Sequence, residues 1–567
     1  RGRGAGGGRR APARCCPRAW RGGRGGFDWG LGTPPWEQVQ LREDEFFASR
    51  APSIAALSGA HRKAAIDALA SEMPMLFAEF QAAKRIFEAT SIYARHSPRF
   101  ASSAVGKLNT YALFAETALA IRAPQGRTGI IVPSGIATDD STKRLFQAII
   151  NDKALVSLLG FDNAKGVFPA VHADTPFCLI TLGSNVTETT LVHYALEIGH
   201  IHDARRRFSL APEDFALLNP NTRTCPVFRS TADAELTKKI YHRVPVLIDE
   251  TKGGAGNPWG LKVIQNFFST SNRHDQKLLR DYEESEADFI SLTPVRRGAM
   301  INQFDHSAAT YDPLTKKFIE EIQKPLKKPI RSDKYVPALE ARARLFEKGW
   351  TRAWLIGWRD VTNATNERTV IASFLPAGPT DDTLSLLLPF KVGPRLAAAL
   401  LGALNSLVLD YVAQQKVGGT HVRKYVMAQL PIPSPDGFTD QDLNFLVPRV
   451  LELTYTAFDL QPFYDDVVAE NPAFDPRPPF ERGQPFAWHP ERRAQLRAEL
   501  DAYYARLYGL TRDELRYVLD PADVMGPDYP SETFRVLKEK EIRQYGEYRT
   551  QRLVLAAWDR LETGALR

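Results

Sequence analysis

Cysteine is scarce in this chain, and its spacing excludes two classes of protein. The 567 residues include only four cysteines: Cys15, Cys16, Cys178 and Cys225. None has the paired spacing of a zinc module or of the disulfide framework of a small secreted domain. We therefore expect the protein to work in a reducing, cytoplasmic compartment.

Long hydrophobic runs and targeting signals are also lacking. The start of the chain has no apolar core segment of the kind that a secretory signal needs. The most apolar run, residues 396–408, is too short for a bilayer and contains Asn405 and Ser406. We expect a buried helix there and no membrane partner.

No single sign of charge dominates, and no internal repeat is visible. Lys and Arg number 73 against 66 Asp and Glu, which gives a net charge of +7. This balance permits a polyanionic partner without requiring one. Hydrophobic residues make up 44% and charged residues 25%, as in an ordinary globular chain, and the length suggests two to four domains.

Residues 1–26 consist mostly of Arg and Gly and cannot bury a core, so they are predicted to be disordered. One interpretation is an Arg/Gly-rich arm that binds nucleic acid. The other is the edge of a fragment, which we favour because the chain begins with Arg1 and its composition changes abruptly at Phe27.

Residues 27–203 alternate between strand-like and helix-like patterns, which favours part of a mostly parallel, doubly wound α/β sheet. In such sheets the chemistry lies at the carboxyl ends of the strands. Strands are expected at 27–32, 129–132 and 177–182, and helices at 108–119 and 145–150, the second capped by Asp139. Residues 204–435 are less regular, and residues 436–567 read as a charged helical region.

A rigid turn follows the first strand and carries groups suited to an aromatic amine. Its residues are Thr33, Pro34, Pro35 and Trp36, and we call it the Pro-Pro turn. An exocyclic amino group becomes a better nucleophile when hydrogen-bond acceptors hold it. A polar side chain and a proline carbonyl supply two acceptors, and the prolines fix them in advance. The aromatic ring offers a stacking surface. An ordinary proline-rich turn is the alternative.

The Pro-Pro turn resembles the Asn/Asp-Pro-Pro-aromatic motif of adenine-N6 DNA methyltransferases. An ordered series of further segments is similar to the gamma-class enzymes of restriction–modification systems, especially the fused type IIG kind. The likeness covers roughly residues 27–560. The segments are 106–114, 126–135, 166–169, 218–228, 303–311, 366–369, 418–423, 430–433, 507–510 and 529–532.

The resemblance implies a fold, a reaction and a set of domains. Residues 27–203 would be the C-terminal part of a Rossmann-like catalytic domain, residues 204–435 a mixed α/β target-recognition region, and residues 436–567 a helical region. The enzyme would transfer a methyl group from S-adenosylmethionine to an adenine flipped out of double-stranded DNA. Trp36 and Phe168 would stack on that base, although Phe168 also fits an ordinary core position.

Two features depart from the family. Thr33 stands where the family has Asn or Asp, and a hydroxyl is a shorter acceptor that also donates. The family's cofactor-binding glycine loop precedes the motif, yet only the Arg/Gly-rich residues 1–26 lie ahead of Phe27. We therefore expect an N-terminally truncated catalytic domain, assign no cofactor residues, and leave open whether a nuclease domain belongs to the protein.

DNA-reading residues are sought in two polar stretches. Arg pairs with guanine and Asn with adenine in the major groove, and cations near paired glycines neutralise phosphates. Solvated loops are the alternative for each stretch. The candidates are Arg359, Asn363, Asn366, Arg368, His421, Arg423 and Lys424, with Lys416 and the 418–419 glycine pair beside them.

Metal chemistry is weakly indicated. His200 and His202 lie beside Asp203 and would share a face of a strand, but two histidines and one carboxylate are a poor signal, and methyl transfer needs no metal.

The sequence thus predicts a site-specific adenine-N6 DNA methyltransferase. An inactive remnant that only binds DNA, and an amino methyltransferase of RNA or protein, remain alternatives. The oligomeric state is not indicated.

Overall fold

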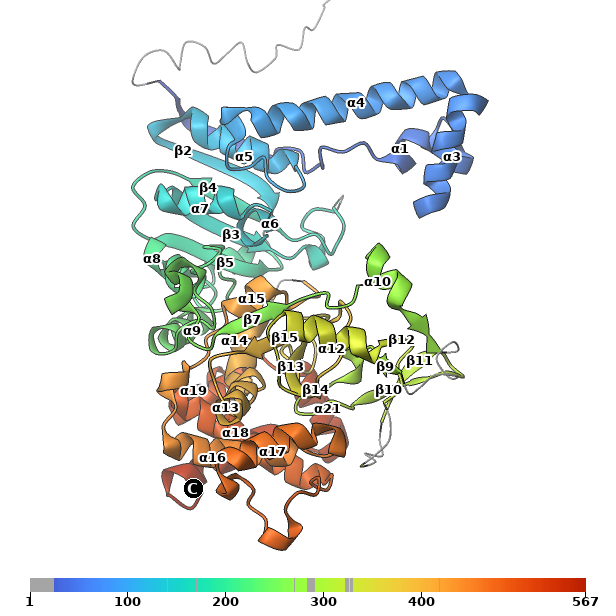
Figure 1. Ribbon diagram of the computed structural model, residues 1–567. Coiled ribbons are helices and arrows are strands. Elements are labelled where there is room, and N and C mark those ends of the chain that lie inside the picture. Colours follow the sequence, from blue (N-terminus) through green and yellow to red (C-terminus); the bar gives the residue numbers. More distant parts are fainter. Residues whose placement is uncertain are drawn as a thin grey trace, which may run out of the picture. The chain divides into compact units, whose positions relative to one another are not determined.

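The computed structural model describes residues 25–139, 141–169, 171–269, 271–282, 291–321, 326, 330–417 and 419–566. Almost all of the Arg/Gly-rich start and Gly418 of the glycine pair lie outside these residues. The chain divides into two compact units (Figure 1). Unit 1 comprises residues 1–216 and 222–225, and unit 2 comprises residues 217–221 and 226–567.

Unit 1 is built on a six-stranded mixed sheet of order β1-β2-β4-β3-β5-β6. Its apolar strand residues, such as Val132, Ile180 and Leu191, are fully buried. The strands are β1 (Phe27–Gly32), β2 (Arg122–Pro133), β3 (Leu155–Phe161), β4 (Phe177–Leu182), β5 (Thr189–Ala195) and β6 (Phe208–Leu210). The helices are α1 (Glu43–Ala48), α2 (Pro52–Ala55), α3 (Gly59–Glu72), α4 (Pro74–His96), α5 (Thr110–Ile121), α6 (Gly135–Thr138), α7 (Lys143–Asn151) and α8 (Pro212–Leu218), the last crossing into unit 2.

The α/β fold class is confirmed, but the sheet is less parallel than expected. β1 pairs in parallel with β2, and β3 with β5. β4 lies between β2 and β3 and runs antiparallel to both, and β6 is antiparallel to β5. The reason is that the chain returns from β3 through a loop rather than a crossover helix, which permits the antiparallel pairing of β4.

Of the local predictions in unit 1, two were confirmed and two were wrong. The strand at 177–182 and the helix carrying Leu145 to Ile150 are present. Asp139 does not cap that helix, because it ends the short helix α6 as its C-cap, and Thr142 takes the N-cap position of α7. His200 and His202 lie in a 3₁₀ turn, Ile198–His202, and not on a strand.

Unit 2 surrounds a four-stranded antiparallel sheet of order β14-β13-β15-β7. The residues of β15 are all buried, and α13 packs against β14. The sheets of this unit comprise β7 (Leu261–Ile264), β8 (Arg280–Asp281), β9 (Leu292–Pro294), β10 (Ala309–Asp312), β11 (Lys317–Glu320), β12 (Lys334–Pro337), β13 (Trp354–Arg359), β14 (Ala372–Pro376) and β15 (Leu384–Pro389).

The region after residue 436 is helical, as predicted, and completes unit 2. Helix α18 packs against α14, α16 and α22. The helices of unit 2 are α9 (Thr231–Arg243), α10 (Arg273–Leu278), α12 (Ala338–Glu347), α13 (Pro394–Leu404), α14 (Leu407–Lys416), α15 (Lys424–Ala428), α16 (Asp440–Thr454), α17 (Gln461–Glu470), α18 (Pro490–Leu507), α19 (Arg512–Leu519), α20 (Pro521–Met525), α21 (Arg535–Tyr545) and α22 (Arg549–Glu562).

The apolar run at 396–408 is buried, but it forms parts of two helices. Ser406 caps α14 by accepting from the Leu409 amide at 3.3 Å, so the chain breaks between α13 and α14. Within the described residues, no single helix is long and apolar enough to cross a membrane. Only α13 and α14 taken together have the length and composition of a membrane span, and the two helices are bent by 57° relative to each other.

A buried histidine makes the stability of unit 1 depend on pH. Burial lowers the pKa of His193 on β5 from 6.5 to about 4. The folded state therefore disfavours the charged ring, so stability is full above pH 6.5 and is lost as the pH falls from 6.5 towards 4. We predict a loss of about 2–3 kcal/mol between pH 7 and pH 4.5, from the 1.36 kcal/mol that each pKa unit represents.

Urea titrations at both pH values, with hydrogen exchange of β5 to assign the loss to unit 1, measure this effect. His193→Gln should remove that part of the pH dependence, whereas His172→Gln, at an exposed position, should keep it. An unchanged pH dependence in His193→Gln would contradict the assignment.

Candidate functional site

The Pro-Pro turn leaves the sheet of unit 1 at the carboxyl end of β1. Gly32, the last residue of β1, pairs with Ile130 of β2. Because the two strands are parallel, their carboxyl ends lie at the same end of the sheet. The turn after β2 begins at Pro133, so this turn and the Pro-Pro turn lie at neighbouring strand ends. This is the edge at which α/β sheets place their ligands.

The start of helix α5 holds the Pro-Pro turn in place. The Thr110 hydroxyl donates to the Pro35 carbonyl at 2.7 Å and accepts from the Glu37 amide at 3.1 Å. The Thr110 amide donates to the Glu37 carbonyl at 2.9 Å, and the next residues, Gln38 and Asn109, form an isolated β-bridge. The turn is therefore fastened on its C-terminal side by groups more than 70 residues away in the sequence.

Trp36 is anchored at its edge and packs on the aromatic core of the strand ends. Its indole Nε1 donates to the Ile131 carbonyl at 3.2 Å. Its ring lies roughly parallel to that of the buried Phe177, with 6.4 Å between centroids and 27° between planes. The indole is half-buried, so it joins this cluster while keeping surface for a further ring.

Phe168 belongs to the same aromatic cluster and is held by a buried asparagine. Its ring centroid is 4.6 Å from that of Phe177. The side chain of Asn163, which is 1% exposed, accepts from the Phe168 amide at 3.0 Å and donates to the carbonyls of Phe168 and Val171. Trp36 and Phe168 thus both contact Phe177, from segments 132 residues apart.

Two acceptors of the Pro-Pro turn remain open. Thr33 is exposed and Pro34 is half-buried. Within the described part of the chain, no hydrogen bond engages the Thr33 hydroxyl or the Pro34 carbonyl, whereas the Pro35 carbonyl is bonded to Thr110. A backbone carbonyl and a hydroxyl at adjacent positions of a braced turn are able to accept two hydrogen bonds from one amino group.

Sequence reasoning missed the residues that position this site. Thr110, Asn163 and Phe177 hold or contact the groups named above, but none was singled out for it. Asn109-Thr110 ahead of an apolar helical run is a helix-start signal, and Asp162-Asn163 is a turn signal, so a local cue existed for both polar residues. Only the fold shows that they reach the Pro-Pro turn and Phe168.

The other edge of β1 faces no strand among the described residues. Trp29 is 78% exposed and Leu31 is 91% exposed. The described residues ahead of the turn, 25–32, form a bend and β1 and contain no loop that opens a helix. They do not fit a cradle for S-adenosylmethionine, and we assign it no residue of this chain.

In unit 2 the structure brings the two candidate DNA-reading stretches together. Val361 forms an isolated β-bridge with His421, and the Thr362 amide donates to the Thr420 carbonyl. The buried carboxylate of Asp360 pairs with Arg423 at 2.8 Å and with His421 at 3.5 Å. Arg423 and His421 remain about two-fifths exposed (42% and 39%), and Lys424 is also exposed.

The remaining candidates make contacts within unit 2. Arg359 donates to the carbonyls of Gly298 and Ile301, and burial lowers its pKa. Arg368 donates to the Asn405 carbonyl and pairs with the buried Asp410 at 3.4 Å. Asn363 and Asn366 bond to neighbouring threonines of their own loop. A role for any of these residues in DNA contact stays a prediction.

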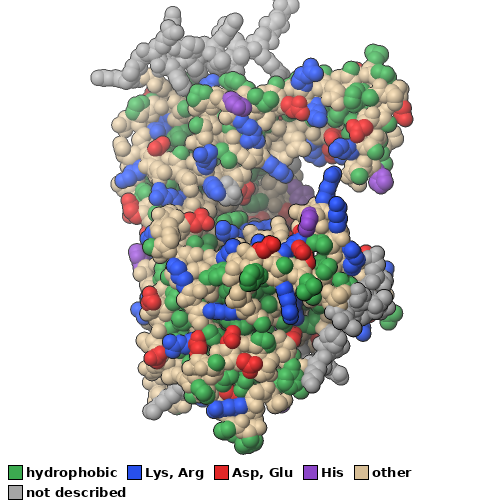
Figure 2. All heavy atoms as spheres, in the orientation of Figure 1, with side chains coloured by type: hydrophobic (Ala, Val, Ile, Leu, Met, Phe, Trp, Pro, Cys, Tyr) green, Lys and Arg blue, Asp and Glu red, His purple; other side chains and the backbone are tan. Residues whose placement is uncertain are grey.

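The face of the molecule in Figure 2 carries Lys and Arg side chains with acidic side chains between them.

In the part of the chain that the structure describes, no group of three or more His, Cys, Asp or Glu side chains is arranged to hold a metal ion. His200 pairs with Glu197 at 3.2 Å.

Comparisons with known proteins bear on this site only weakly. No protein-family model matches the chain, and no curated protein matches it. The solved structures to which it is similar include the methyltransferase subunit of a type I restriction–modification system from Streptococcus thermophilus. That match has 16% identity and a TM-score of 0.19, and covers 25% of this chain and 35% of the other.

Two other similar structures are a type IIG and a type IIL enzyme. The type IIG restriction endonuclease BpuSI matches with 12% identity and a TM-score of 0.25, over 77% of this chain and 52% of that one. The type IIL enzyme MmeI, in complex with DNA, matches with 10% identity and a TM-score of 0.36, over 92% of this chain and 57% of that one. The chain thus spans about a third to three-fifths of the length of these proteins. TM-scores of this size are too low to support a functional inference.

Proposed function

We propose that this chain is the base-binding and DNA-reading part of an adenine-N6 DNA methyltransferase of the restriction–modification kind. The observation that carries the proposal is the braced Pro-Pro turn. Thr110 bonds Pro35 and Glu37 on the two sides of Trp36, and the Ile131 carbonyl accepts from the Trp36 indole. The Thr33 hydroxyl and the Pro34 carbonyl stay open at the carboxyl end of the strands.

The residues of this chain would act on the extruded base. Thr33 and the Pro34 carbonyl accept hydrogen bonds from the adenine amino group, which directs the nitrogen lone pair away from the ring. Trp36 stacks on the base, and Phe168 closes the pocket from the loop that Asn163 holds. S-adenosylmethionine supplies the methyl group when bound. The exposed His421, Arg423 and Lys424 contact the phosphates of double-stranded DNA.

DNA binding without turnover is a second candidate function, and one observation favours it. Thr33 stands where the family resemblance leads us to expect a stronger carboxamide acceptor. An amino methyltransferase of RNA or protein is less favoured, because unit 2 adds a large second body to the sheet.

Changing Thr33 separates these candidates. In a chain extended at its N-terminus by a cofactor-binding segment, Thr33→Asn should raise the rate of methyl transfer about tenfold or more, because a carboxamide carbonyl is a better directed acceptor. Thr33→Val, which keeps the shape and removes the acceptor, should lower the rate by about a hundredfold. The assay is transfer of labelled methyl from S-adenosylmethionine to duplex DNA. Equal rates in all three proteins would refute the role of Thr33, and DNA binding without transfer in any of them would favour the second candidate.

Stacking on Trp36 can be tested without the cofactor. Trp36→Ala should weaken the binding of duplex DNA with one unpaired adenine by about 5- to 150-fold, because base stacking is worth roughly 1–3 kcal/mol. Fluorescence anisotropy at fixed salt measures the affinity. Trp29→Ala removes an exposed indole from the neighbouring strand and serves as the control. Equal losses in both variants would argue against stacking at Trp36.

Lys424, the exposed cation beside the two paired loops, should contact a DNA phosphate. Lys424→Gln is expected to reduce the slope of log K against log salt by about one, and to weaken binding equally for different DNA sequences. Lys63→Gln, an equal change of charge on exposed α3, should leave the slope unchanged. The slope is obtained from titrations at several salt concentrations, and an unaltered slope in Lys424→Gln would remove this residue from the interface.

A further inference from the structure

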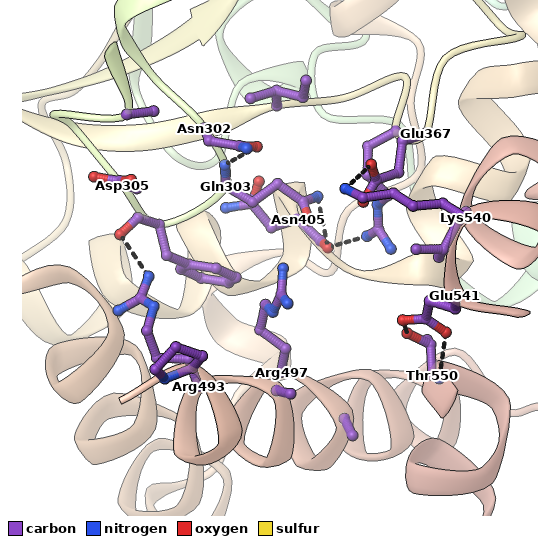
Figure 3. Close-up of a pocket in the computed structure, with 18 of the residues that line it drawn as sticks. Asn302, Gln303, Asp305, Glu367, Asn405, Arg493, Arg497, Lys540, Glu541 and Thr550 are labelled. Carbon is purple, nitrogen blue, oxygen red and sulfur yellow. Dashed lines mark hydrogen bonds and ion pairs between the residues drawn. The ribbon is translucent and has the colours of Figure 1, made fainter. Parts of the chain in front are cut away.

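Unit 2 contains a cavity of about 1100 Å³ that the proposed function does not use. This volume is at the upper end of pockets that hold small ligands. Residues of β13, of the 365–368 loop and of helices α13, α18, α21 and α22 line it, so its wall comes from the sheet and from the C-terminal helices (Figure 3). Six Arg and Lys side chains line it: Arg359, Arg368, Arg493, Arg497, Lys540 and Arg549.

Five of these cations are already held by groups of the protein. Arg359 and Arg368 donate to backbone carbonyls, as described above. Arg493 donates to the Leu453 carbonyl at 2.7 Å. Lys540 pairs with Glu367 at 2.7 Å, and Arg549 pairs with Glu491 at 2.6 Å.

Arg497 is the exception. In Figure 3 it projects from α18 into the cavity towards Asn405, with no interaction drawn. Among the described residues its guanidinium has no hydrogen bond and no ion pair within 4.0 Å, although its side chain is exposed to the cavity space. Burial, together with the charge of Arg368, lowers its pKa. Its guanidinium is therefore available to a ligand that enters the cavity.

The acidic groups nearest to Arg497 do not fill that role. The charges of Asp501, Glu367 and Glu541 act on it from beyond ion-pair distance. Glu367 is engaged by Lys540, and Glu541 accepts from the Thr550 amide and hydroxyl, each at 2.7 Å. Asp501 accepts from the Leu407 amide at 2.8 Å, and burial raises its pKa to about 6.

We propose that the cavity is a phosphate-binding site in which Arg497 holds the phosphoryl group of a nucleotide or of a nucleic-acid strand. The planar guanidinium matches phosphate oxygens with two parallel hydrogen bonds. The exposed side chains of Gln544 and Tyr545 on α21 give the organic part of such a ligand a polar contact and a ring. The site lies wholly in unit 2, and it does not depend on methyl transfer.

Isothermal titration of the full chain with inorganic phosphate, adenosine monophosphate and a short duplex tests the site. We expect at least one phosphate ligand to bind, and Arg497→Gln to weaken that binding tenfold or more. Arg497→Lys should retain part of it. Arg506→Gln, on the same helix but outside the cavity wall, should bind as the wild type does.

The pattern of ligands identifies the source of the phosphate. Binding of the monophosphate points to a free nucleotide, and an Arg497-dependent loss for the duplex alone points to a DNA strand. The same ligands should raise the melting temperature of the wild type but not of Arg497→Gln, and that variant should melt no lower than the wild type without ligand. Absence of binding by all three ligands, equal binding by Arg497→Gln, or a large fall in its melting temperature would overturn the proposal.

Discussion

The hydrogen bond from the Thr110 hydroxyl to the Pro35 carbonyl is the contact on which the candidate site depends. It engages the second proline carbonyl of the turn and leaves the first one open. It also fixes the direction of the Trp36 side chain. The indole of Trp36 donates to the Ile131 carbonyl and packs on the ring of Phe177. The two prolines restrict the backbone of the turn. Because Thr110 at the start of helix α5 bonds the Pro35 carbonyl, the Pro34 carbonyl is the one that stays open.

Under the proposed function, the two units would contribute different chemistry. Unit 1 offers neutral acceptors and aromatic surface at a strand end, which suits an uncharged base. Unit 2 offers the exposed cations Arg423 and Lys424 on one of the two loops that lie together at Asp360, which suits a polyanion. The buried carboxylate keeps Arg423 and His421 together, so the positive charge is placed by a fixed pair rather than by loose surface side chains.

The sequence predicted those parts of the fold whose signals are local. The strand at 177–182, the helix over Leu145 to Ile150 and the helical C-terminal region follow from apolar periodicity. The antiparallel place of β4 and the cap at Thr142 depend on neighbours and were not predicted. The same holds for the site: the Pro-Pro turn is a local motif, whereas the support from Thr110 and Asn163 arises only when distant segments pack together.

In the proposed function, Thr33 and the Pro34 carbonyl hold the amino group of an extruded adenine. A structure of the chain bound to duplex DNA with one unpaired adenine measures this directly. The adenine amino nitrogen should lie within about 3 Å of both acceptors, the usual hydrogen-bond distance, with the base stacked on Trp36. An adenine that stays in the helix, or that lies elsewhere while Pro34 remains unbonded, would contradict it.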